Sequence, residues 1–386
     1  MVQGKRAATS LESTDLHRQP NSEAELKRLS EKELPELPPL SAYLIDRQRA
    51  IIDSGRAKFA ADRSISLSDV GTTVFHTHTA NCGTTNGKYK GSWDGEVTIP
   101  ALAAWANEWW PDRKVNICLS DHDVESKAQW RMQVAASNGC GSRSNIKFSN
   151  GTEISSADGH FIVQTNDKDF KPFGRNTPAE AIAREIANLK EENPKLMYEL
   201  IIPHASMSTT DVGHILGSAF RTSMGIESIA KVLKVAAKND EIVFIEERNG
   251  LTPSTVYRLP GGVHRNVREL FEKNAAWIYG ADAHALEHFS TNVMFFDLKG
   301  REEFTPETAF EMLKEQKRRE LKGGRPEIAA GFSVYDSMNG FENLAMRANM
   351  ACWYVGGFGA LAARELSAVL RRERDGLENP VVDALL

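Results

Sequence analysis

The chain has 386 residues, of which 41% are hydrophobic and 26% are charged. This is the composition of a globular protein with one large domain or two ordinary ones. Its formal net charge of -5 excludes a global electrostatic attraction to nucleic acid or to anionic membranes, so a polyanionic substrate would have to be attracted locally. The four cysteines have no CxxC spacing and no segment is apolar enough to span a bilayer. We therefore expect a cytoplasmic protein without a membrane partner.

The N-terminal part divides into two segments. Residues 1–40 are polar and end in a proline-containing stretch, which predicts a flexible tail and linker. Residues 41–72 follow with apolar side chains at helical spacing, and we expect this helical lead-in to pack on the main domain. The apolar residues that carry the pattern are Leu44, Ile51, Ile52 and Phe59.

Short apolar runs then alternate with amphipathic helical patterns. The predicted strands are 73–78, 114–122, 145–154, 160–164, 198–204, 240–247 and 276–284. The predicted helices are 99–110, 125–137, 178–192, 226–238 and 266–275. Alternation of this kind predicts a parallel α/β fold, and about seven units favour a barrel over an open sheet. Residues 73–290 would form the barrel and residues 291–386 a helical C-terminal extension.

Histidines and carboxylates gather where the predicted strands end. His76 and His78 are separated by one residue on a strand, so both imidazoles should point to the same face and could bind one metal ion. A single histidine at a strand end is more often structural, but the pattern recurs on five strands in order, at the end of a barrel where active sites are built. The candidate ligands are His76, His78, Asp94, His122, Glu153, His160, His204, Asp282 and His284. A set of this size suits two or three zinc, iron or manganese ions better than calcium or magnesium.

These residues lie in motifs that resemble those of the polymerase and histidinol phosphatase (PHP) family. The motifs are FHTHT (75–79), SWDG (92–95), ICLSDHD (117–123), GTEIS (151–155), GHFIVQ (159–164), LIIPHA (200–205) and GADAHAL (280–286). The resemblance covers roughly residues 73–290. It implies a distorted seven-stranded (β/α) barrel, with two or three metal ions at its mouth.

The resemblance also implies how the ligands divide among the ions. One ion would take His76, His78, Glu153 and Asp282, a second would share Glu153 and add His160 and His204, and a third would use Asp94, His122 and His284. In the family the early aspartate follows the His-x-His pair within a few residues, whereas residues 79–91 of this chain contain no acid. We interpret residues 79–91 as an insertion and Asp94 as the displaced ligand.

Several basic and aromatic residues are candidates for substrate binding. The insertion carries Lys88 and Lys90 and is followed by Trp93, so it could be a lid that contacts a phosphate and a base or sugar. A solvated glycine-rich loop explains the same residues equally well. Further candidate phosphate ligands are Arg143, Arg221, Arg248 and His264. Each of these, taken alone, is more often an ordinary surface or salt-bridge residue.

The resulting hypothesis is a metal-dependent phosphoesterase that hydrolyses phosphate monoesters of a small metabolite or nucleotide by a metal-bound hydroxide. One alternative is a phosphodiesterase or exonuclease that acts on nucleic acid ends. The basic segment 314–325 could contact nucleic acid, although the solvated end of an amphipathic helix explains it better. Another alternative is a metal-stabilised scaffold without catalytic activity. The substrate, the metal and the oligomeric state are left open by the sequence.

Overall fold

The computed structural model of the protein describes most of the residues that were predicted to form the barrel. They are residues 39–79, 97–110, 113–127, 129–131, 133, 146–174, 176–205, 224–250, 264–284, 286–324, 328–340 and 342–346. The chain divides into two compact units, Met1–Ser337 and Met338–Leu386. Everything described below belongs to the first unit. The predicted tail, residues 1–38, lies outside the described residues.

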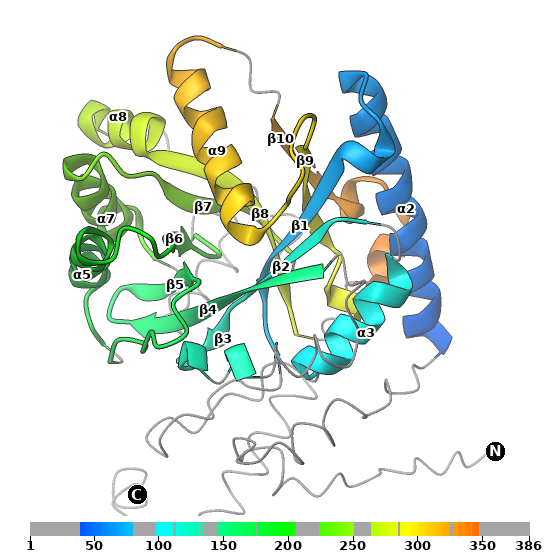
Figure 1. Ribbon diagram of the computed structural model, residues 1–386, viewed down its shortest axis with the longest axis horizontal. Coiled ribbons are helices and arrows are strands. Elements are labelled where there is room, and N and C mark those ends of the chain that lie inside the picture. Colours follow the sequence, from blue (N-terminus) through cyan, green and yellow to red (C-terminus); the bar gives the residue numbers. More distant parts are fainter. Residues whose placement is uncertain are drawn as a thin grey trace, which may run out of the picture. The chain divides into compact units, whose positions relative to one another are not determined.

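Seven strands close into a barrel (Figure 1). Their order is β1 (Val70–Thr77), β2 (Val115–Leu119), β4 (Ile146–Ser156), β5 (Gly159–Thr165), β6 (Tyr198–Ile202), β7 (Val243–Asn249) and β8 (Ala275–Ala283), and β8 pairs with β1 to complete the ring. The short strand β3 (Asp121–His122) pairs with the end of β4. The predicted α/β barrel is therefore confirmed at this level.

The barrel is mixed, which corrects the expectation of a wholly parallel arrangement. Strand β5 runs antiparallel to both β4 and β6, whereas the other neighbouring strands of the barrel are parallel. Only Ala157 and Asp158 connect β4 to β5. A parallel connection needs a crossover of a dozen or more residues, so these two strands can only form a hairpin.

Two further strands extend the sheet beyond the barrel. Strand β9 (Asn292–Asp297) pairs antiparallel with Val70–Thr73 of β1, and β10 (Ala329–Ser333) pairs antiparallel with β9. β8 pairs with β1 farther along, from Phe75 to Thr77, so the two halves of β1 have different partners on this side. The expectation of a helical extension after residue 290 is thus wrong for these stretches, which belong to the same compact unit as the barrel.

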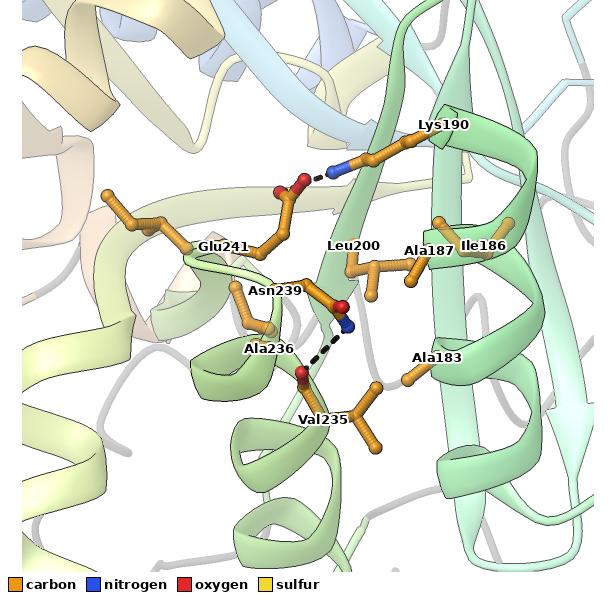
Figure 2. A pocket seen from close by; sticks show the side chains of 11 residues that line it. Ala183, Ile186, Ala187, Lys190, Leu200, Val235, Ala236, Asn239 and Glu241 are labelled. Atoms are coloured by element: carbon orange, nitrogen blue, oxygen red, sulfur yellow. Dashed lines mark hydrogen bonds and ion pairs between the residues drawn. The ribbon is translucent and has the colours of Figure 1, made fainter. Parts of the chain in front are cut away.

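Amphipathic helices cover the outside of the barrel. Helices α5 (Ala179–Glu192), α7 (Ile226–Lys238) and α8 (Arg265–Asn274) pack their apolar faces against the outer side chains of the strands. Figure 2 shows the contact between α5 and α7, where Lys190 forms an ion pair with Glu241. The cavity between them has a volume of about 10 Å³. That is the space of a single water, so it is a packing gap and not a substrate site.

Helix α9 (Pro306–Leu321) covers the end of the barrel where the parallel strands begin. Thr305 caps the helix by accepting a hydrogen bond from the backbone N–H of Thr308. The ring of Phe310 packs into the barrel against Phe75 and Phe244, with centroid distances of 5.3 and 5.0 Å. Because α9 buries this face in the core, the opposite end of the barrel is the one left for a functional site.

This packing explains two of the basic residues in segment 314–325. Lys314 and Lys317 are both buried on the barrel side of α9. The ammonium group of Lys314 donates hydrogen bonds to Glu199 in β6 and to Glu311. These two lysines therefore belong to the interior of the fold and not to an exposed basic patch.

Two further helices pack beside the strands. Helix α2 (Pro39–Arg63) buries Leu44, Ile51, Ile52 and Phe59, and the Phe59 ring lies 5.7 Å from that of Phe295 in β9. Helix α3 (Ile99–Trp109) begins at Thr98, whose side chain accepts a hydrogen bond from the backbone N–H of Ala101. Among the helices that the structure describes, none has the length and apolarity needed to span a membrane.

Candidate metal centre

The eight candidate ligands that the structure describes converge at the end of the barrel opposite α9. His76 and His78 come from the end of β1, His122 from β3 and Glu153 from β4. The others are His160 at the start of β5, His204 just after β6, and Asp282 and His284 at the end of β8. Since β5 is antiparallel, its start lies at the same end as the carboxyl ends of the parallel strands. The hairpin pairing, with His160 opposite Ser155, places His160 beside Glu153.

Glu153 is buried at the centre of this cluster. Its Oε2 atom lies 3.2 Å from Nε2 of His76, 3.2 Å from Nε2 of His78 and 3.4 Å from Nε2 of His122. Its Oε1 atom lies 2.6 Å from Nδ1 of His160 and 3.0 Å from Nε2 of His204. The two oxygens thus face different groups of imidazoles, as expected of a carboxylate that bridges two ions.

Asp282 is the second carboxylate of the cluster. Its Oδ1 atom lies 3.4 Å from Nε2 of His76, 3.5 Å from Nε2 of His78 and 3.0 Å from Nε2 of His284. The rings of His78 and His284 stack with a centroid distance of 4.3 Å and an interplanar angle of 6°. His284 is therefore part of the cluster through both Asp282 and His78.

Among the residues that the structure describes, three overlapping sets of buried or half-buried groups could hold metal ions. They are His76, His78 and Asp282; His76, Glu153 and His204; and His78, His122 and Glu153, and within each set the ligand atoms lie within 4.8 Å of one another. The first set corresponds to the first ion implied by the sequence, without Glu153. In the second set, His76 stands where the sequence implied His160. In the third, His78 and Glu153 stand where it implied Asp94 and His284.

The hydrogen bonding of His76 shows why these groups suit a cation. Nδ1 of His76 lies 2.7 Å from Oε1 of Glu246. A carboxylate can only accept, so Nδ1 must donate, and in the neutral ring Nε2 then presents a lone pair. That lone pair faces the carboxylate oxygens of Glu153 and Asp282. Such an arrangement is favourable only when a proton or a metal ion lies between the lone pairs.

Other buried polar atoms also need a partner. Nδ1 of His204 has no hydrogen-bond partner among the described residues, and Nδ1 of His160 and Oε1 of Glu153, although 2.6 Å apart, are not aligned as a hydrogen bond. Buried polar atoms are rarely left in this state in native proteins. Imidazole nitrogens and carboxylate oxygens are ligands that zinc, iron and manganese accept. The residues present therefore fit the ions that the sequence predicts.

Charges within the cluster are strongly coupled. Burial disfavours the protonated form of His76, but the carboxylates around the ring outweigh burial and raise the pKa of His76 well above its usual value. The pKa values of His78 and His204 are raised against the effect of burial in the same way. Burial opposes ionisation of Glu153 and Asp282, yet the surrounding imidazoles hold the pKa of each carboxyl well below its usual value. Both acids are therefore ionised at neutral pH.

The backbone around the ligands is unusual. His76, His204 and Asp282 have φ values of 60°, 28° and 48°, in the left-handed region that residues other than glycine rarely adopt. The pairing of β1 with β2 also shifts register between Val74 and Thr77. The two imidazoles of the His-x-His pair do converge, at 3.0 Å between their Nε2 atoms, but they do so through this irregularity and not through regular strand alternation. Strained backbone of this kind concentrates at functional sites.

Two side chains that the sequence interpretation missed form hydrogen bonds to the candidate ligands. Glu246 accepts the hydrogen bond from His76, and Asn249 donates through Nδ2 to Glu246 and to Asp282. Glu246 lies near the end of a predicted strand, as the identified ligands do, but the adjacent Glu247 carries the same signal. Asp121 has a similar role: it accepts hydrogen bonds from Thr79 and Gln129 and so ties the segment after β1 to that of His122.

The predicted substrate-binding residues are placed differently. Asp94, the predicted ligand, lies outside the described residues, as do the predicted substrate contacts Lys88, Lys90, Trp93, Arg143 and Arg221. Arg248 forms an ion pair with Asp336 at 2.6 Å and lies over the ring of Tyr279. His264 is exposed and caps α8 by accepting a hydrogen bond from the backbone N–H of Asn266. These contacts do not support phosphate binding by Arg248 or His264.

No family model matches this chain, and no curated protein matches it significantly. What the protein does must therefore be inferred from the chemistry of the cluster.

Proposed function

We propose that the protein is a metal-dependent phosphoesterase that hydrolyses phosphate monoesters of a small metabolite or nucleotide. The observation that carries the proposal is the position of Glu153, whose two oxygens face five imidazoles from four different segments. A bridging carboxylate among histidines is typical of sites that hold more than one ion. Such sites activate water and stabilise the charge of a phosphoryl group in transfer.

Each part of the cluster has a defined task in this proposal. Bound divalent ions would polarise a phosphoryl oxygen and lower the pKa of a water molecule. Glu153 and Asp282 supply the negative charge that holds the ions, and the imidazoles supply neutral nitrogen ligands. Glu246 orients His76 so that Nε2 faces the cluster. The open end of the barrel is where the loops that bind a substrate would gather.

A small substrate is favoured over nucleic acid by the placement of the basic segment. Lys314 and Lys317 are buried in α9, at the end of the barrel opposite the cluster. They are therefore in the wrong place to guide a polynucleotide to the ligands. The net charge of -5 also gives no long-range attraction for a polyanion.

The proposal is tested with the full chain, loaded separately with manganese, iron or zinc and supplied with a chromogenic phosphate monoester or the corresponding diester. We expect release of phosphate from the monoester with at least one metal, and faster turnover of the monoester than of the diester. Glu153→Gln keeps the shape of the side chain but removes the charge, so activity should fall to background. Glu191→Gln, on the exposed face of α5, is the matched control and should retain full activity.

Other outcomes identify the alternatives. Faster turnover of the diester would favour a phosphodiesterase or exonuclease. Metal binding without hydrolysis of either ester would favour the scaffold. Full activity of Glu153→Gln would contradict a catalytic role for the cluster, because the central charge would then be dispensable.

A further inference from the structure

A single buried carboxylate connects the strands that carry the ligands. Glu246, in β7, accepts a hydrogen bond from Nδ1 of His76 at 2.7 Å through Oε1. Its Oε2 accepts hydrogen bonds from the backbone N–H of His204 at 2.8 Å and from Nδ2 of Asn249 at 2.9 Å. Glu246 is thus in direct contact with residues from β1 and from the segment after β6. It is nevertheless not a member of any of the three candidate ligand sets.

Asn249 extends this connection to β8. The same Nδ2 group that donates to Glu246 lies 3.0 Å from Oδ2 of Asp282. Glu246 and Asn249 together therefore contact His76, His204 and Asp282. These are the three candidate ligands whose backbone is in the left-handed region. Conformations of this kind persist only where surrounding contacts fix them, and the hydrogen bonds of Glu246 and Asn249 are such contacts.

The neighbouring backbone is shaped to admit the carboxylate. A Cβ atom at Gly280, on β8, would lie 1.9 Å from Oε1 of Glu246. Any side chain there would displace Glu246 from His76. A glycine is therefore required at position 280, because only a residue without a side chain allows the backbone of β8 to come this close to the carboxylate of Glu246.

We propose that Glu246 is a positioning residue for the ion position that contains His76, an inference that rests on the proposed metal centre. It holds His76 in the tautomer whose Nε2 faces the ions, and it fixes the backbone of His204. Through Asn249 it also orients Asp282. The two sets that contain His76 depend on these contacts. The third set, His78, His122 and Glu153, has no hydrogen bond to Glu246 among the described contacts.

The direct test is Glu246→Gln in the full chain. Glutamine has the same size, but its amide offers one acceptor oxygen, whereas the site presents three donors. At least one donor would then face the NH₂ group of the glutamine. We expect affinity for Mn²⁺ or Zn²⁺ to fall about 10–100-fold at the position that contains His76, as for other groups that orient metal ligands. The position formed by His78, His122 and Glu153 should keep its affinity, so ions bound per chain should decrease without reaching zero.

Glu247→Gln is the matched control. It removes the same charge from the adjacent residue of β7, whose side chain lines an outer cavity with Trp277 and Tyr279. Its ion stoichiometry and affinities should equal those of the wild type. For both variants, metal content is measured by mass spectrometry and metal affinity by isothermal titration calorimetry. Neither readout depends on the reaction that the protein catalyses.

A second variant separates positioning from a general effect on folding. Asn249→Ala removes the hydrogen bond to Asp282 and leaves the contact between Glu246 and His76. It should weaken the set that contains Asp282 more than the set that contains His204. The thermal stability of each metal-free variant, measured in parallel, shows how much folding alone has changed.

The outcomes are distinguishable. If wild-type protein binds no metal, the metal centre fails and the role of Glu246 fails with it. If the wild type binds metal and Glu246→Gln binds the same number of ions with the same affinities, only the positioning role is overturned. Equal weakening at all positions would overturn it too, because the proposed effect is selective. If metal binds with the expected selectivity but no phosphate is released, the positioning role of Glu246 stands and only the proposed reaction is overturned.

Discussion

At the scale of single residues, the cluster combines ionised carboxylates with imidazoles whose protonation depends on them. The pKa values of His76, His78 and His204 are raised because the carboxylates outweigh the effect of burial. These rings therefore hold protons in the metal-free protein at a pH where free imidazole has lost them. A metal ion must displace these protons when it binds.

This gives a pH prediction with a definite sign. A raised histidine pKa contributes stability below the unfolded value of about 6.5 that is lost as pH rises through the folded value. The metal-free protein should therefore lose stability as pH rises above about 6.5. Metal affinity should rise over the same range, since fewer protons compete. Melting temperatures with and without Zn²⁺, recorded at several values between about pH 6 and about pH 9, should diverge as pH rises. Parallel curves would contradict the prediction.

Most candidate ligands could be predicted from the sequence because each is a histidine or acid at the end of an apolar run. Glu246 could not be assigned in this way. It stands beside Glu247, and strand alternation alone does not show which of the two faces the cluster. The pairing of β7 with β8 shifts register between Glu246 and Arg248, so alternation also misplaces Arg248, which pairs with Asp336. Local irregularities of this kind depend on the neighbouring strand and are not visible in the sequence of one strand.

At the scale of elements, the β4–β5 hairpin and helix α9 act at opposite ends of the barrel. The hairpin brings His160 to the cluster, and α9 covers the other end with Phe310 and Lys314. The sequence identified the strand at 160–164 but not its direction, which follows from the two-residue connection. It missed β9 and β10 because these strands lie beyond the motifs; β9 pairs with half of β1, and β10 pairs with β9.

The contact of α9 with β6 gives a stability prediction. Lys314 and Glu199 are both buried and hydrogen-bonded to each other. Lys314→Met should reduce the free energy of unfolding by about 3 kcal/mol, because a buried carboxylate is left without its main partner. Lys190, 4.0 Å from Glu199, limits the loss. The double variant Lys314→Met/Glu199→Gln should lose less than the single variant.

Urea unfolding measures these free energies. Lys322→Met, the same substitution at an exposed residue, is the control. Metal content should be unchanged in all three variants because α9 lies at the far end of the barrel. A single variant as stable as the wild type would show that the pair contributes nothing to the fold.

At the scale of the whole molecule, the fold places a cluster of histidines and carboxylates, which could hold metal ions, at one end of a closed barrel whose other end is filled. The sequence predicted this arrangement from the number of strands and the order of the motifs. It did not predict the mixed strand directions or the extension of the sheet through β9 and β10, since both depend on which strands pair.

The position of Glu153 between metal ions can be tested by X-ray diffraction from crystals of the manganese- or zinc-loaded protein, recorded on both sides of the metal absorption edge. We expect anomalous peaks within ligand distance, about 2.0–2.2 Å for zinc, of both carboxylate oxygens of Glu153, and none in crystals of Glu153→Gln at the position facing His160 and His204. Anomalous peaks located elsewhere, or no peaks from protein loaded in excess metal, would contradict it.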